Sequence, residues 1–249
     1  MQVHIVQWDI AWEAPAQNRL VIQELLANRS IASGDLVVLP ETCFTGFTMS
    51  SAFAEHREVD GETADRQWLA HLARQLEITL VAGVIENSQN VALVYGPSGT
   101  LLAHYAKQRP FLLGGEVWIA GTAPAMFLWN GLRVCPFICY DLRFPELFRT
   151  ATSTWQPELL LVIASWPEPR IHHWTRLLIA RAIENQCYVA GVNRTGTDPT
   201  FRYVGASTLV DWNGDTLLVA GHQPVCMGEA LDITGLLAYR KAFPFIQRL

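Results

Sequence analysis

A cysteine ends an apolar run in the stretch RVCPFIC, residues 133–139. This run has the length and composition of a buried strand, and Cys139 is its last residue. Charged side chains follow at once, at Asp141 and Arg143. Because α/β proteins bind ligands at the carboxyl ends of strands, Cys139 is a candidate nucleophile, although a cysteine taken alone more often packs in a core.

A nucleophilic thiol needs a group that removes its proton, since only a few per cent of an ordinary cysteine is thiolate at neutral pH. Glu41 comes after the predicted strand DLVVLP, and Lys107 comes after LLAHYA. Parallel strands deliver their carboxyl ends to one edge, where a carboxylate, an ammonium group and a thiol can converge. Each residue alone is better explained as an ordinary side chain, so the inference depends on all three. A Cys–His hydrolase with His104 as the base is the alternative.

The remaining pattern supplies the elements that position these groups. Strands are predicted at 3–10, 35–41, 78–86, 90–96, 100–106, 125–129, 132–139, 158–164, 187–193 and 225–231, and helices at 15–32, 63–77 and 169–186, from Pro145 and from about 233. Both halves follow the order strand, helix, strand, helix and hairpins. This order permits a four-layer αββα sandwich of two sheets. Since no Pro/Ser-rich linker divides the chain, we expect a single domain over residues 1–249.

Composition argues against several classes of function. Half of the 249 residues are hydrophobic and 16% are charged, so the chain can bury a large core. The net charge is -5 and no basic run interleaves with aromatics, so neither nucleic acid nor a membrane is expected as a partner. No signal peptide is recognisable and five cysteines are scattered, which predicts a reduced, cytoplasmic protein. The adjacent His172 and His173 point apart on a helix, so no metal or other cofactor is expected.

The motifs around the three reactive residues resemble those of the nitrilase superfamily, the carbon–nitrogen hydrolases. VVLPETCFTGF resembles the glutamate motif, HYAKQRPF the lysine motif and ICYDLRFPEL the cysteine motif, while ASWPEPR and RAIENQCYVAGVNRTG extend the match over nearly the whole chain. The resemblance implies the αββα sandwich of two mixed sheets. It also implies Cys139 as the nucleophile of a thioester mechanism, Glu41 as the general base and Lys107 as the oxyanion stabiliser. Because Lys107 is expected to favour the thiolate, Cys139 should react with electrophiles faster than the other four cysteines.

The resemblance implies two further roles, and this sequence departs from the family pattern at two places. The backbone N–H of Tyr140 would complete the oxyanion hole, and Glu116 in LLGGEVWIAG would help to position the substrate and the lysine. Arg109 and Pro110 stand where many relatives have histidine and leucine, which puts the loop around Glu116 in question. Ser165 stands before WP where many relatives have asparagine, which puts substrate preference in question.

Within the superfamily the sequence is most similar to ω-amidases, which hydrolyse the terminal amide of short 2-oxo acid amides such as 2-oxoglutaramate. The resemblance implies a small amide substrate, no cofactor, and a homodimer or larger homo-oligomer. We expect Arg143 to bind the substrate carboxylate, the alternative being an ion pair with Glu146. We expect Phe44 and Trp166 to form apolar walls. Nitrile or N-carbamoyl hydrolysis with the same three residues and a non-catalytic scaffold of the same fold are the other hypotheses.

Overall fold

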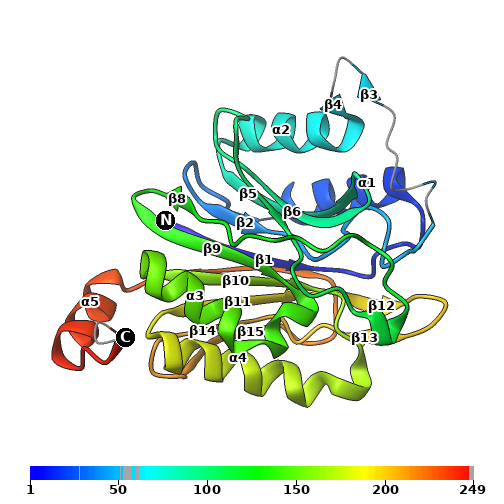
Figure 1. Ribbon diagram of the computed structural model, residues 1–249. Coiled ribbons are helices and arrows are strands. Elements are labelled where there is room, and N and C mark those ends of the chain that lie inside the picture. Colours follow the sequence, from blue (N-terminus) through cyan, green and yellow to red (C-terminus); the bar gives the residue numbers. More distant parts are fainter. Residues whose placement is uncertain (28, 51, 53–57, 60–61, 247–249) are drawn as a thin grey trace.

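Two six-stranded sheets form the centre of the protein (Figure 1). The computed structural model describes residues 1–27, 29–50, 52, 58–59 and 62–246. In hydrogen-bonded order, the first sheet consists of β16 (Val225–Ala230), β1 (Gln2–Gln7), β2 (Leu36–Val38), β5 (Thr79–Glu86), β6 (Gln89–Tyr95) and β7 (Leu101–Ala106). The second consists of β15 (Thr216–Val219), β14 (Thr208–Val210), β11 (Tyr188–Asn193), β10 (Leu159–Ala164), β9 (Leu132–Ile138) and β8 (Phe127–Trp129).

Helices cover the outer faces of both sheets (Figure 1). Helices α1 (Pro15–Ala27) and α2 (Ala64–Leu76) lie on the first sheet, and α3 (Pro145–Trp155) and α4 (Ile171–Asn185) lie on the second. A fifth helix, α5 (Ile233–Ala242), lies beyond the edge of the second sheet near the end of the chain. This arrangement confirms the predicted αββα sandwich of two mixed sheets.

Strand alternation explains why both faces of the first sheet are buried. In β1, Val3 and Ile5 pack against the second sheet, whereas Val6 packs on the side of the helices. In β2, Val38 faces the second sheet and Val37 faces the helices. Successive side chains point to opposite faces of a sheet, so a continuous apolar run fills two layers of core at once.

The strand directions bring the predicted reactive residues to related positions. Strands β1, β2 and β5 are parallel, and β6 and β7 each reverse direction, so β7 runs the same way as β2. The chain therefore leaves β2 towards Glu41 and leaves β7 towards Lys107 at the same edge of the first sheet. In the second sheet, β9, β10 and β11 are parallel, and β9 ends immediately before Cys139.

The structure differs from the predicted elements in several places. The predicted helix 15–32 ends at Ala27; residue 28 lies outside the described residues, and 29–32 are not helical. The predicted strand 225–231 pairs with β1 in the first sheet, although it follows the second half of the chain. Two short hairpins were not predicted, β3–β4 (Glu58–Val59 and Glu62–Thr63) and β12–β13 (Thr195–Thr197 and Arg202–Val204). Within the described ranges, no helix combines the length and the apolar character that crossing a membrane requires.

Candidate active site

The strand ends bring Glu41, Lys107 and Cys139 together. Lys107 Nζ donates a hydrogen bond to Glu41 Oε1 at 2.9 Å, and the Cys139 thiol lies close enough to the Glu41 carboxylate for that charge to raise the pKa of the thiol. The side chains of Glu41 and Lys107 are 0% and 1% exposed, whereas Cys139 lines a pocket. A base, a cation and a thiol thus share one small volume at the bottom of this pocket.

A second carboxylate, Glu116, belongs to the same buried cluster. Lys107 Nζ donates to Glu116 Oε2 at 2.8 Å, so its ammonium group lies between two carboxylates. Asn90 Nδ2 bridges the same pair, 2.8 Å from Glu41 Oε1 and 3.0 Å from Glu116 Oε1. Asn90 was missed in the sequence, although an asparagine within the apolar strand QNVALVY is a signal, because asparagine is depleted in strands.

Backbone contacts hold the glutamate of the cluster in place. The Ser165 backbone N–H donates to Glu41 Oε2 at 2.6 Å, so both oxygens of Glu41 accept hydrogen bonds. Gly83 in β5 packs directly under this segment, and a Cβ atom there would lie 2.5 Å from the Glu41 Cα. The close approach of β5 therefore depends on the absence of a side chain at Gly83.

Cys139 lies on a strained turn. Cys139 has φ 47°, a left-handed conformation that is unusual for a residue with a Cβ, and it begins the 3-10 helix Cys139–Arg143. The Asp141 carboxylate stabilises this turn, because it accepts from the Ile138 backbone N–H at 3.0 Å, the Arg109 backbone N–H at 2.9 Å and the Tyr105 hydroxyl at 2.7 Å. Burial raises the Asp141 pKa to about 6 despite these bonds. Asp141 thus connects the cysteine turn to the segment that follows Lys107.

The buried charges determine which groups carry protons. Burial alone lowers the pKa of an amine, but the Glu41 and Glu116 carboxylates outweigh it and hold the Lys107 pKa well above its ordinary value. Burial and then the Glu41 carboxylate raise the pKa of Cys139 well above its ordinary range, and Lys107 offsets only part of this rise. Lys107 thus favours the thiolate, as expected, but burial and the Glu41 carboxylate outweigh it. The environment of Cys139 therefore favours the protonated thiol.

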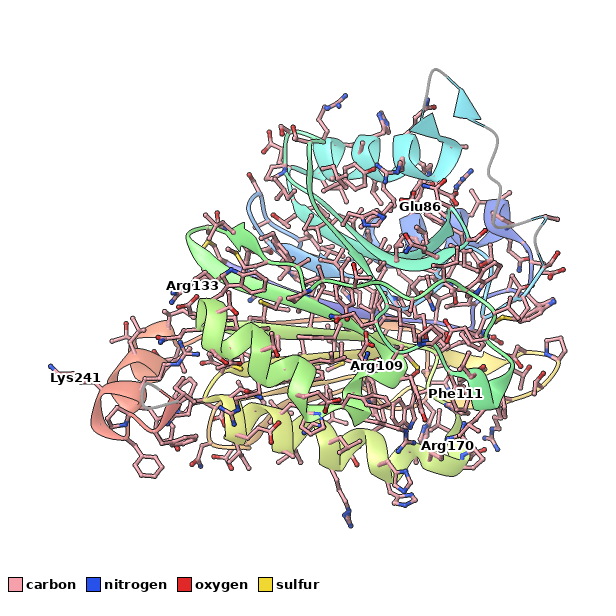
Figure 2. The ribbon with its side chains drawn as sticks, viewed as in Figure 1. Glu86, Arg109, Phe111, Arg133, Arg170 and Lys241 are labelled. Atoms are coloured by element: carbon pink, nitrogen blue, oxygen red, sulfur yellow. The ribbon has the colours of Figure 1, made fainter. Side chains whose placement is uncertain are left out.

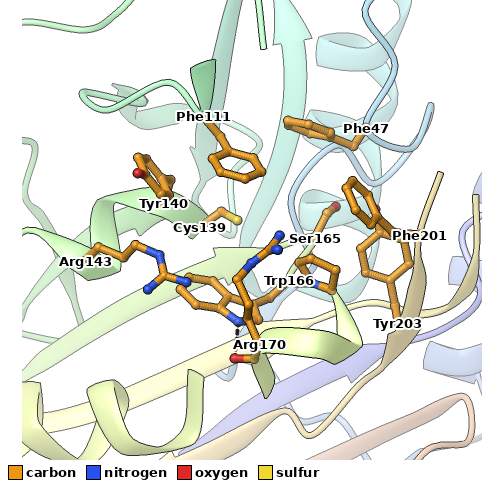
Figure 3. Close-up of a pocket in the computed structure, with 11 residues that line it drawn as sticks. Phe47, Phe111, Cys139, Tyr140, Arg143, Ser165, Trp166, Arg170, Phe201 and Tyr203 are labelled. Carbon is orange, nitrogen blue, oxygen red and sulfur yellow. Dashed lines mark hydrogen bonds between the residues drawn. The ribbon is translucent and has the colours of Figure 1, made fainter. Parts of the chain in front are cut away.

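The thiol faces a pocket of about 400 Å³, part of which is open to solvent (Figure 3). Its wall is largely aromatic, formed by Phe47, Phe111, Tyr140, Trp166, Phe201 and Tyr203, together with Ser165 and Pro167. Two cationic side chains, Arg143 and Arg170, also line it. The pocket is therefore suited to a small substrate with an apolar middle and a negative charge.

The two predicted apolar walls have different positions in the structure. Trp166 lines the pocket, and its backbone N–H is held by Asn193 Oδ1 at 2.7 Å. The expectation for Phe44 is corrected, because its ring is buried in the core beside α2, 5.3 Å from the Trp68 ring in an edge-on contact. Phe47, three residues later, lines the pocket instead. The chain from 41 to 45 is an irregular turn, where the two-residue period of a strand no longer assigns sides.

Arg143 is oriented by aromatic side chains. Its guanidinium carbon lies 4.7 Å from the Trp166 ring centroid, and its nitrogens lie 3.3 Å from His173 Nδ1. The alternative expectation, an ion pair between Arg143 and Glu146, finds no support, since Glu146 lies 3.8 Å from Arg109 instead.

Both departures from the family pattern lie next to the cluster. Arg109 donates its backbone N–H to Asp141, and Glu116 still reaches Lys107 across the loop that follows Pro110. Ser165 lines the pocket, and its backbone N–H serves Glu41. The loop change is thus compatible with the lysine contact, and the change at position 165 lies where substrate would touch.

The Cys–His alternative finds no geometric support. His104 Nε2 lies 3.1 Å from Glu86 Oε1, and Glu86 also pairs with Arg66 of α2. Figure 2 shows Glu86 beneath this helix, apart from Arg109 and Phe111 near the cysteine turn. Because neighbouring strand residues point to opposite faces, His104 points towards the helix layer when Tyr105 faces Asp141.

Comparison with known proteins agrees with this arrangement. Residues 2–229 match the model of the family described as carbon-nitrogen hydrolase. The chain belongs to the carbon–nitrogen hydrolase family. The 2-oxoglutaramate amidase of Bacillus subtilis (strain 168) is 32% identical to this hydrolase, with 97% of this chain and 95% of that protein covered. The omega-amidase YafV of Escherichia coli (strain K12) is 34% identical, with 98% and 94% covered.

Solved structures agree with the family assignment and the fold. XC1258 from Xanthomonas campestris, described as a CN-hydrolase superfamily protein with an arsenic adduct in the active site, superposes with a TM-score of 0.89 at 32% identity, covering 100% of this chain and 97% of that one. Saccharomyces cerevisiae Nit3, of branch 10 of the nitrilase superfamily, has a TM-score of 0.83 at 20% identity, covering 98% and 94%, and supports the fold alone. The predicted family and the nitrilase-like fold are confirmed.

Proposed function

We propose that this hydrolase cleaves the terminal amide of a short 2-oxo dicarboxylate monoamide, such as 2-oxoglutaramate, and releases ammonia. The observation that carries the proposal is that Glu41 accepts a hydrogen bond from Lys107 and lies beside Cys139, the thiol of which lines a pocket. Relatives that align over nearly the whole chain are named 2-oxoglutaramate amidase and omega-amidase. The arginine side chains of the pocket support a substrate that carries a carboxylate.

In the first half of the reaction, the thiol proton passes to the Glu41 carboxylate and the sulfur attacks the amide carbon. The resulting oxyanion is stabilised by Lys107 Nζ and by the backbone N–H of Tyr140, near the start of the 3-10 helix, where N–H groups lack intrahelical partners. Glu41 then returns the proton to the amide nitrogen as the C–N bond breaks. Ammonia leaves, and the acyl group remains on Cys139 as a thioester.

In the second half, water takes the place of ammonia. Glu41 removes a proton from the water, the oxygen attacks the thioester carbon, and the same donors stabilise the second oxyanion. Collapse breaks the C–S bond, releases the acid, and returns the proton from Glu41 to the sulfur. One carboxylate thus acts in turn as base and acid, as its place beside Cys139 allows.

Lys107 acts as a fixed positive charge in this scheme. Its two carboxylate partners hold its pKa well above the ordinary value, so it keeps its proton through the cycle. It therefore serves as an electrostatic donor and not as a base. Its placement between Glu41 and Glu116 also limits its movement, which keeps the cost of reorganisation low when the oxyanion forms.

Ammonia release and mass spectrometry test the proposal. We expect wild-type protein to release ammonia from 2-oxoglutaramate much faster than from glutamine, and a quenched reaction to carry an acyl adduct on the peptide containing Cys139. Glu41→Gln should lose about 10²- to 10⁴-fold in kcat, the usual contribution of a general acid–base, and Cys139→Ser should form no thioester. If the protein turns over nitriles or N-carbamoyl compounds in preference to amides, it is a nitrile or N-carbamoyl hydrolase instead. Absence of any acyl adduct on Cys139 would favour a non-catalytic binding scaffold.

Two sequence-based expectations accompany this proposal. We expect the protein to form a homodimer or a larger homo-oligomer, and to act in the cytoplasm on a small amide. The first is measured by light scattering with size-exclusion chromatography, and the second by fractionation of cells that produce the protein.

A further inference from the structure

Arg170 lies at the pocket beside residues that the sequence motifs did not identify. It ends the 3-10 helix Glu168–Arg170, and its backbone carbonyl accepts a hydrogen bond from Trp166 Nε1 at 2.8 Å. Its guanidinium carbon lies 5.4 Å from the Phe111 ring centroid and 5.9 Å from that of Phe201. The segment that anchors the Trp166 ring therefore also places a cation at the pocket (Figure 3).

Within the described part of the chain, no carboxylate forms an ion pair with either arginine of this pocket. Arg143 contacts His173 Nδ1, which accepts as a neutral ring nitrogen, and among the described residues neither Arg143 nor Arg170 has a carboxylate within ion-pair distance. Glu168, two residues before Arg170, lies 3.7 Å from Arg202 Nε instead. Two unneutralised guanidinium groups beside aromatic walls repel each other, and an anion between them would remove that repulsion.

We propose that Arg170 acts with Arg143 as the second guanidinium of a carboxylate subsite, and that Arg170 determines the preference for amides with a carboxylate remote from the scissile bond. An ionised carboxylate has two oxygens with about four acceptor positions, enough for two guanidinium groups. The aromatic faces beside Arg170 hold its planar group and leave its N–H groups available. This inference rests on the proposed function and deepens it.

The chemical class that fits is an amide whose far end is a carboxylate, flanked by a short apolar chain. A 2-oxo group next to that carboxylate adds one more acceptor oxygen for the same two donors. An amide with a neutral far end offers the two guanidinium groups a single carbonyl oxygen and no negative charge, which weakens binding more than it slows the chemistry at Cys139. The expected signature of Arg170 is therefore a change in KM that depends on substrate charge.

The experiment compares glutaramate with glutaramide, two amides of equal length that differ by a charged or a neutral far end. Arg170→Gln should raise KM for glutaramate and for 2-oxoglutaramate at least tenfold and change KM for glutaramide less than twofold. Glutarate, which carries no scissile amide, should lose at least tenfold as a competitive inhibitor. Arg170→Lys, which keeps the charge but loses the fork, should give an intermediate shift.

Arg176→Gln on the exposed side of α4 is the matched control, because it removes the same charge away from the pocket. The deciding quantity is kcat/KM for glutaramate divided by kcat/KM for glutaramide. If wild type prefers glutaramate and this ratio is the same in wild type, Arg170→Gln and Arg176→Gln, the inference is overturned and the proposed function is left intact. A wild-type protein with no preference for glutaramate would overturn the proposed function itself. If Arg170→Gln has a clearly lower melting temperature than wild type, the same kcat/KM ratio is measured on Arg170→Lys, and an unchanged ratio there overturns the inference.

Discussion

Replacement of Glu116 by glutamine tests how the buried charge cluster works. The Glu116 carboxylate accepts from three donors: Lys107 Nζ at 2.8 Å, Asn90 Nδ2 at 3.0 Å and the Phe111 backbone N–H. A glutamine of the same shape has only one acceptor oxygen, and its amide N–H groups would face at least one of these donors. One buried donor therefore loses its partner, and the ammonium group of Lys107 keeps a single counter-charge, on Glu41.

The size of the effect follows from the kind of bond that is lost. A hydrogen bond between charged groups in a buried site contributes about 1.5–3 kcal/mol. Because each 1.36 kcal/mol changes a rate about tenfold, Glu116→Gln should lower kcat/KM about 10- to 100-fold. The loss should appear mainly in kcat, since Glu116 contacts the lysine and does not itself line the pocket.

A second measurement should change in the opposite direction. Burial, Glu41 and then Glu116 raise the Cys139 pKa, so removal of the Glu116 charge should lower it. Iodoacetamide should therefore alkylate Cys139 of the Glu116→Gln variant faster than Cys139 of wild type at neutral pH, although the variant turns substrate over more slowly. The pH dependence of alkylation measures the shift of the Cys139 pKa.

Glu146→Gln is the control, because Glu146 is an exposed glutamate whose 3.8 Å contact with Arg109 lies on the surface. It should leave both the turnover and the alkylation rate within twofold of wild type. Turnover of a folded Glu116→Gln variant within twofold of wild type would refute the role of Glu116, and slower alkylation would refute the electrostatic account of the thiol.

Three further predictions concern a close backbone contact, a buried ion pair and the exposure of the cysteines. Gly83→Ala places a Cβ 2.5 Å from the Glu41 Cα, so the base must shift and kcat should fall about 100-fold in a folded protein; a normal kcat would contradict this close approach. Burial alone would raise the Glu86 pKa, but Arg66 holds it at about 2, below the ordinary 4.5. This depressed pKa stabilises the fold above pH 4.5, and the gain is lost as pH falls towards 2, so Glu86→Gln should cost about 2–3 kcal/mol at pH 7 and almost nothing near pH 2 in denaturant unfolding. Iodoacetamide should label Cys139 alone in the native protein, because the other cysteines are at most 1% exposed, and equal labelling of all five, read by mass spectrometry, would disprove this.

Much of the fold could be predicted because strand signals are local. Apolar runs that end in a charged or polar residue predicted β2, β7 and β9 to within a few positions, and these ends carry Glu41, Lys107 and Cys139. The order of strands and helices limited the layers to an αββα sandwich. The partner of β16 could not be predicted, because pairing with β1 joins segments more than 200 residues apart and leaves no local pattern.

The pocket was predicted less completely, since its wall comes from irregular segments. Phe44 and Phe47 are three residues apart in a turn, and only the tertiary structure places one in the core and the other at the pocket. Phe201 and Tyr203 belong to an unpredicted hairpin, and Arg170 follows a strand by several residues. No period of the sequence indicates which side such residues face.

The amino-acid sequence by itself determined the reactive groups and the layers that carry them, because residue type and hydrophobic period are properties of short segments. Only the tertiary structure decided the protonation state of Cys139. The sequence supplies a nearby lysine, which favours a thiolate; the folded chain adds burial and the carboxylates of Glu41 and Glu116, which favour the thiol more strongly. Solvent exclusion and the distances between charges arise from segments far apart in the chain, so they exist only after folding.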